Sequence, residues 1–166
     1  MLDREARVDL QEKLLKKFKA PLLFMRVNYP GLNKDNLLTN NIIQDMDSIV
    51  TDIFSAQLKF RLFKTTAEGP NVTMIIEKDA VELKKTAMLI EENHTLGRCI
   101  DIDIYDNNTG EAISRRDMGI EPRRCYICSE LAVNCVRSQK HGEAQIIRFI
   151  QDKYKEFMES FYGKRL

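Results

Sequence analysis

The segment Gly97–Ile104, with the sequence GRCIDIDI, places two carboxylates two positions apart in an apolar, β-branched run. In a β-strand, successive side chains point to opposite faces, so Asp101 and Asp103 would share one face while the isoleucines take the other. The carboxylates would then lie roughly 6 to 7 Å apart, close enough to bind one divalent cation or to share a pair of ions with a phosphate. Oxygen ligands favour magnesium or manganese. An ordinary edge strand with an acidic outer face shows the same alternation, so the strand alone leaves both interpretations open.

Two Arg-Arg pairs follow this segment on either side of a loop that contains Gly119 and Pro122; they are Arg115, Arg116, Arg123 and Arg124. An isolated Arg-Arg pair is by default a solvated surface feature. Guanidinium groups beside a carboxylate-bound cation are, however, what phosphoryl and nucleotidyl transfer requires, because they neutralise the charge that develops on the phosphates. The two pairs therefore favour a phosphate-handling site.

His94 stands three residues before Gly97, at the mouth of the expected carboxylate strand. It could contact phosphate or assist proton transfer, and the more ordinary interpretation is a surface or capping histidine.

Soft metal ligands form a second group, with the pattern Cys125-x2-Cys128-x6-Cys135-x5-His141. These four side chains could complete a closed, tetrahedral zinc site. If residues 126–141 are helical, the cysteines would instead share one helix face as buried free thiols. A third interpretation turns His141 toward phosphate together with Arg137.

The elements that position these residues follow from hydrophobic periodicity. We expect helices over 3–19, 35–57, 79–92 and 142–162, and strands over 22–27, 58–63, 72–76, 100–104 and 111–114. The order βαββαβ plus a hairpin strand predicts an α+β fold, with a mainly antiparallel sheet of four to five strands and helices covering one face. Residues 1–166 would form one domain, with an N-terminal helix (1–20), an α/β core (21–114) and an Arg/Cys-rich loop with C-terminal helices (115–166).

Composition limits the function classes. The chain has 166 residues, 43% hydrophobic and 31% charged, with a net charge of +1. This balance argues against nucleic-acid binding by bulk electrostatics, so an anion site must be local. No apolar stretch approaches the roughly 20 residues that span a bilayer, and the N-terminus is charged and unlike a signal peptide. We therefore expect a cytoplasmic protein without a membrane partner, whose cysteines are thiols or metal ligands.

Several blocks resemble one known family, the apo-citrate lyase phosphoribosyl-dephospho-CoA transferases, also called holo-citrate lyase acyl-carrier-protein synthases. The blocks are residues 94–104, 114–117, 122–128 and 132–137, followed by His141. The resemblance implies a nucleotidyltransferase-like enzyme that takes triphosphoribosyl-dephospho-CoA and attaches its phosphoribosyl-dephospho-CoA part to a serine of the citrate lyase acyl carrier protein, the gamma subunit. Diphosphate leaves.

The resemblance also implies roles for individual residues. Asp101 and Asp103 would hold magnesium and act in catalysis with His94, and the serine nucleophile would come from the carrier. The residues expected to bind substrate are Arg4, Gly97, Arg98, Ser114, Arg115, Arg116, Arg123, Arg124 and Arg137. Two rival classes remain: a nucleotidyltransferase that acts on another acceptor, such as the malonate decarboxylase carrier, and a non-catalytic, zinc-stabilised binding module.

Overall fold

The computed structural model describes residues 2–163 and divides the chain into two compact units, Met1–Ile113 and Ser114–Leu166. Met1 and residues 164–166, which the expected single domain includes, lie outside the described residues. The single-domain organisation stays a prediction, and each unit is considered by itself.

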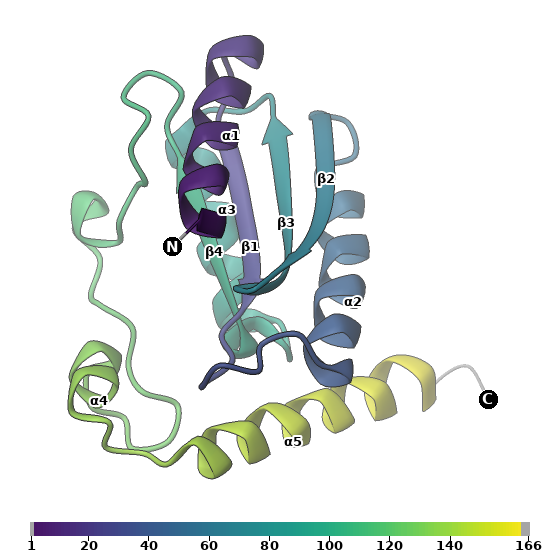
Figure 1. Ribbon diagram of the computed structural model, residues 1–166, viewed down its shortest axis with the longest axis vertical. Coiled ribbons are helices and arrows are strands. Elements are labelled where there is room, and N and C mark those ends of the chain that lie inside the picture. The colour runs from purple at the N-terminus through teal and green to yellow at the C-terminus, as the bar shows by residue number, and fades with distance from the viewer. Residues whose placement is uncertain (1, 164–166) are drawn as a thin grey trace. The chain divides into compact units, whose positions relative to one another are not determined.

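The first unit is built on one sheet of four antiparallel strands (Figure 1). The strands are β1 (Leu22–Val27), β2 (Leu58–Thr66), β3 (Gly69–Ile76) and β4 (Ile100–Tyr105), arranged in the order β2-β3-β1-β4. The predicted α+β class and the βαββαβ order are confirmed.

The predicted fifth strand over 111–114 is wrong in extent, since this segment contributes only an isolated bridge between Tyr105 and Ala112. The hairpin turn forms, with the Asp106 amide donating to the carbonyl of Glu111 at 2.9 Å. At Ser114 the chain enters a tight turn instead, because the Ser114 hydroxyl donates to the Asp117 carboxylate at 2.7 Å. That local bond replaces strand pairing.

Helices cover both faces of the sheet, which corrects the expected single covered face. The helices α2 (Leu37–Ile53) and α3 (Ala80–Asn93) lie behind the sheet in Figure 1, and α1 (Leu2–Phe18) lies in front of it. Leu14 and Leu15 of α1 pack with Leu22 and Phe24 of β1. Both faces need cover because β3 is buried along its whole length and β1 nearly so.

Local capping explains where the helices begin. Asn36 accepts from the Thr39 amide and the Asn36 amide donates to the Thr39 hydroxyl, a reciprocal capping box that starts α2 two residues later than predicted. Asp79 caps α3 by accepting from the amides of Val81 and Glu82, and it stands where the expected helix over 79–92 begins. On α3, Leu83 and Met88 are buried, whereas Val81 and Leu89 are exposed.

The second unit contains the 3₁₀ turn η2 (Arg116–Met118) and the helices α4 (Ala132–Ser138) and α5 (Glu143–Tyr162). The predicted C-terminal helix is confirmed. The hypothesis that 126–141 is one helix is wrong, because α4 begins only at Ala132 and ends at Ser138, after which Gln139 caps it with a left-handed backbone (φ 49°).

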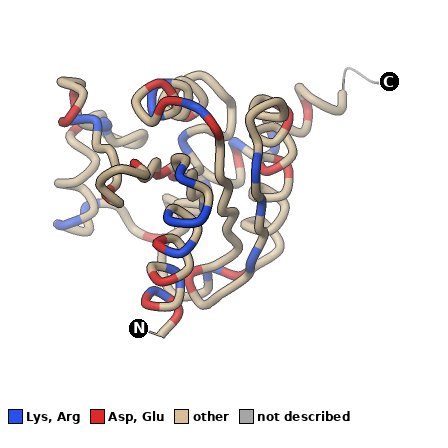
Figure 2. The backbone as a smooth tube through the Cα atoms, turned by 90° about the horizontal axis from the view of Figure 1, so that it is seen from above, with Lys and Arg blue, Asp and Glu red and all other residues tan. Residues whose placement is uncertain are grey.

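Charges of both signs are interspersed along the chain (Figure 2), in keeping with its near-zero net charge. Within residues 2–163, no helix has the length and apolar character needed to cross a membrane.

Candidate functional site

The strand β4 presents its two carboxylates on one face. Its isoleucines are buried, whereas Asp101 and Asp103 are half-buried, as the period-two pattern predicts. This strand is the edge of the sheet, beside β1. The two carboxylates therefore remain partly accessible to solvent.

The register across β1 adds a cation that sequence reasoning missed. Arg26 lies directly opposite Asp101, and its Nε stands 3.9 Å from the Asp101 Oδ2; Phe24 lies opposite Asp103. On the far side of β1, Asn71 is opposite Arg26. The only available signal was that Arg26 is the single charged residue in an otherwise apolar strand, LLFMRV.

The helix α1 borders this face through Arg7. The Arg7 guanidinium lies 4.7 Å from the centre of the Phe24 ring, and its Nε donates to Glu68 at 3.0 Å. The apolar end of α1 covers Leu22 and Phe24, so one end of the face is packed and the Arg26–Asp101 end carries polar groups.

Electrostatics at the pair favour a bound cation. Burial, together with the neighbouring Asp101 charge, raises the pKa of the Asp103 carboxyl above its ordinary value, and the positive charges of Lys84, Arg26 and Arg7 only partly oppose this. Two carboxylates that repel each other in a partly desolvated place are a suitable ligand set for a hard divalent ion such as magnesium. The residues present therefore fit the expected metal.

The outer edge of β4 is fixed by two buried side chains of α3. The Ile102 amide donates to Glu91 Oε1 at 2.9 Å, and the Lys84 ammonium donates to the Ile102 carbonyl at 3.4 Å. These bonds satisfy the backbone groups of an edge strand and hold its register. They therefore fix the direction in which Asp101 and Asp103 project.

The residues just before β4 have structural explanations of their own. His94 forms the C-cap of α3, its Nδ1 accepts the Leu96 amide at 3.1 Å, and burial lowers its pKa. A side chain at Gly97 would place its Cβ 2.4 Å from two backbone carbonyl oxygens of α3, so only glycine fits. Arg98 is half-buried in the short turn η1 (Gly97–Cys99). The catalytic and substrate roles of these residues stay predictions.

The remaining predicted substrate ligands are spread over both units. Arg4 is exposed on α1 in the first unit, where Arg7, not Arg4, reaches Phe24. In the second unit, Ser114 and Asp117 close the turn that carries the first Arg-Arg pair, and Arg124 pairs with Glu121 at 4.0 Å. The structure thus brings together Asp101 and Asp103, and it groups the remaining arginines within the second unit: Arg115, Arg116, Arg123, Arg124 and Arg137.

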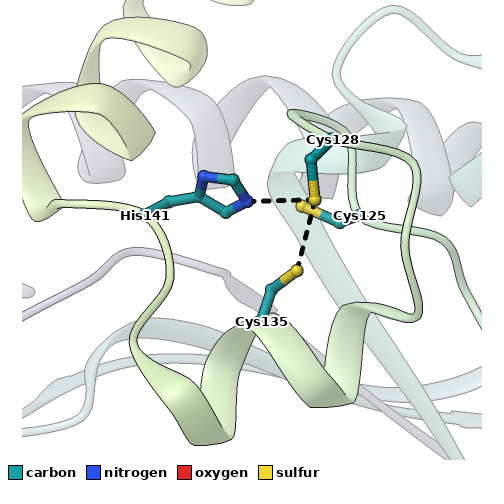
Figure 3. A group of neighbouring side chains, drawn as sticks. All are labelled: Cys125, Cys128, Cys135 and His141. Carbon is teal, nitrogen blue, oxygen red and sulfur yellow. Dashed lines mark hydrogen bonds between the residues drawn. The ribbon is translucent and has the colours of Figure 1, made fainter.

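The Cys/His pattern folds into one cluster, drawn in Figure 3, in which the four ligand atoms lie within 4.8 Å of one another. The Cys128 Sγ stands 3.4 Å from the Cys135 Sγ and 3.3 Å from the His141 Nε2. Cys125 and Cys135 are buried. The structure therefore contains a Cys3His cluster able to hold a metal ion.

The thiols of this cluster differ in acidity. Burial raises the pKa of Cys125, but backbone amides of Cys128 and Ile127 donate to its sulfur and bring that pKa below the ordinary value of a thiol. The Glu130 amide acts in the same way on Cys128 and lowers its pKa. Burial and hydrogen bonds to the other two sulfurs raise the pKa of Cys135 to about 12.

Comparison with known proteins agrees with the resemblance. A profile of the family described as "Apo-citrate lyase phosphoribosyl-dephospho-CoA transferase" matches residues 1–157. A probable apo-citrate lyase phosphoribosyl-dephospho-CoA transferase of Vibrio cholerae serotype O1 is 30% identical over 162 residues, covering 95% of this chain and 90% of that protein. The apo-citrate lyase phosphoribosyl-dephospho-CoA transferase of Escherichia coli O7:K1 is 31% identical over 144 residues, covering 85% of this chain and 78% of the relative. The chain therefore belongs to the apo-citrate lyase phosphoribosyl-dephospho-CoA transferase family.

Proposed function

We propose that this protein transfers phosphoribosyl-dephospho-CoA from its triphosphate precursor to a serine of the citrate lyase acyl carrier protein, with release of diphosphate. The observation that carries the proposal is the carboxylate pair of β4, which lies beside Arg26 in a chain whose family membership spans nearly its whole length. The relatives' names supply the acceptor, apo-citrate lyase, and the transferred group.

Asp101 and Asp103 would hold the magnesium ion. When bound, magnesium would neutralise charge on the triphosphate and make diphosphate a better leaving group. Arg26 forms an ion pair with Asp101, so it can compensate the carboxylate charge before substrate arrives and contact a phosphate oxygen afterwards. Its planar guanidinium suits either partner.

The serine nucleophile comes from the carrier, so this chain has to supply only a proton acceptor. A carboxylate oxygen of the pair is one candidate. His94 is the other, because burial lowers its pKa and so favours the neutral imidazole, but its Nδ1 accepts the Leu96 amide and would have to leave that hydrogen bond to take the proton. In either case the oxygen–phosphorus bond to serine forms as the bond to the diphosphate oxygen breaks, and the serine proton passes to the acceptor.

Carrier recognition would use exposed basic residues. Family expectation makes the carrier acidic, and α1 carries exposed lysines that could attract it: Lys13, Lys16 and Lys17. The arginines of the second unit offer a second surface of the same charge.

The proposal is tested by measuring diphosphate release with precursor, magnesium and either of two apo carriers, from citrate lyase and from malonate decarboxylase. Release with the citrate lyase carrier alone supports the proposal. Release only with the other carrier would assign the activity to a different acceptor, and release with neither carrier by a folded protein would favour a non-catalytic binding module.

A further inference from the structure

We propose that Cys125, Cys128, Cys135 and His141 form a closed zinc site that folds the Arg/Cys-rich segment. This proposal does not rest on the transferase activity. A tetrahedral zinc with sulfur at about 2.3 Å and nitrogen at about 2.0 Å sets its ligand atoms about 3.5 to 3.8 Å apart. The Cys128–Cys135 and Cys128–His141 separations of 3.4 and 3.3 Å are close to that edge length.

The backbone around the first two cysteines is shaped to carry metal-bound thiolates. The Ile127 amide donates to the Cys125 Sγ at 3.4 Å, the Cys128 amide also donates to that sulfur, and the Glu130 amide donates to the Cys128 sulfur. Amide donors of this kind stabilise negative charge on sulfur, which is the form that binds metal.

Further backbone hydrogen bonds close residues 123–132 into a compact loop, called the knuckle below, next to α4. The Cys125 amide donates to the Glu130 carbonyl at 2.6 Å, and the Ala132 amide donates to the Arg123 carbonyl at 2.9 Å. Beyond α4, the Lys140 amide returns to the Cys135 carbonyl at 3.1 Å and so places His141 at the cluster. Three separate pieces of chain thus converge on one point.

The described part of the second unit has a small buried apolar core. Among residues 114–163 the buried apolar side chains are those of Cys125, Cys135, Ile150 and Phe157. Two of these four are ligands, and the other two lie on α5. One aromatic stack, Tyr126 on Phe149 with ring centres 4.1 Å apart, joins the knuckle to α5. A segment with so small a core needs a metal or another cross-link for stability.

Four protein ligands complete the coordination of zinc, so no position remains for water or substrate, and the metal's role is structural. Its consequence is local order. Arg124 is bridged to Leu131 across the knuckle, so fixing the knuckle also fixes the Arg123–Arg124 pair relative to α4. Binding releases the protons of the coordinating thiols.

The first test is the zinc content of the full-length protein, purified under reducing conditions and measured by elemental analysis. We expect about one zinc per chain, lost in Cys135→Ser and in His141→Ala. Cys99→Ala is the matched control, because Cys99 is the remaining cysteine, is buried, and lies in the first unit. Zinc in the wild type that survives both ligand substitutions would overturn the proposal, as would its loss in the control.

The second test keeps the wild-type chain and therefore does not depend on variants that fold. Reconstitution with cobalt should give the intense visible bands of a tetrahedral thiolate site, and chelation should expose residues 114–141 to protease while the first unit stays resistant. A weak, octahedral cobalt spectrum would contradict the proposal. An unchanged cleavage pattern after complete metal removal would do so too, and so would a Cys128–Cys135 disulfide in place of metal.

Discussion

Replacing each carboxylate of the β4 pair by asparagine should separate their two contributions to stability while removing activity in both cases. At the strand spacing of roughly 6.6 Å between residues i and i+2, two full charges repel by about 0.6 kcal/mol in water and about 2.5 kcal/mol near a protein surface. Lys84, Arg26 and Arg7 offset part of this for Asp103, yet burial and Asp101 still raise its pKa, so the charged form is disfavoured on balance. We therefore expect Asp103→Asn to raise the free energy of unfolding by about 1 kcal/mol.

Asp101→Asn should behave differently, because Asp101 has Arg26 as a partner at 3.9 Å. That partly exposed ion pair is worth about 0 to 1 kcal/mol, so its loss cancels most of the relief of repulsion. The free energy of unfolding should stay within about 0.5 kcal/mol of the wild type. In both variants, transfer should fall by about 10²- to 10³-fold, the usual cost of removing a preorganised electrostatic group.

The two readouts are urea unfolding followed by circular dichroism and transfer of the prosthetic group to the carrier. Glu111→Gln serves as the control, since Glu111 is an exposed acid just beyond the same strand. Retained transfer in both variants would remove the metal assignment. A loss of more than about 1 kcal/mol of stability in Asp103→Asn would show instead that this carboxylate is a structural group.

Three further predictions concern pH, packing and charge. Because the pKa of Asp103 is raised in the folded state, the folded protein binds more protons than the unfolded chain at pH values between the ordinary and the raised pKa. The wild type should therefore lose stability relative to Asp103→Asn as the pH rises through that window. A difference in stability that does not change with pH would contradict the raised pKa. Gly97→Ala should lower the free energy of unfolding in urea by about 1 to 3 kcal/mol, because the new Cβ meets two carbonyl oxygens of α3. Gly142→Ala is the control and should be nearly neutral, because no atom lies within 4 Å of its new Cβ. Equal effects of the two substitutions would contradict the packing explanation. Neutralising three lysines of α1 together, Lys13, Lys16 and Lys17, should raise the carrier's Kd at low salt and much less at high salt. An unchanged Kd would exclude these lysines from carrier docking.

Sequence patterns predicted the elements well where periodicity and caps agreed. The carboxylate alternation on β4 and the Asp79 cap of α3 both follow from short-range rules that need no partner. The predicted strand over 111–114 is wrong in extent because the Ser114 hydroxyl donates to Asp117, and this local bond competes with pairing to β4. The alternation of apolar and polar residues does not reveal such a bond.

Long-range neighbours could not be predicted from the sequence in the same way. Arg26 is 75 positions from Asp101, and only the register of β1 on β4 brings them together. The buried Lys84 and Glu91 resemble surface charges in a helix, and their role at the Ile102 edge appears only once α3 is placed. The Cys/His spacing predicted a possible metal site, but the four side chains come together only because residues 126–131 form a turn and not part of one helix over 126–141.

The proposed transfer is measured directly by the intact mass of the citrate lyase acyl carrier protein after incubation with this protein, precursor and magnesium. We expect a mass gain equal to one phosphoribosyl-dephospho-CoA group. The gain should depend on magnesium, and it should be absent with a carrier whose acceptor serine is replaced by alanine. An unchanged carrier mass, in the presence of folded protein and all reactants, would contradict the proposed transfer.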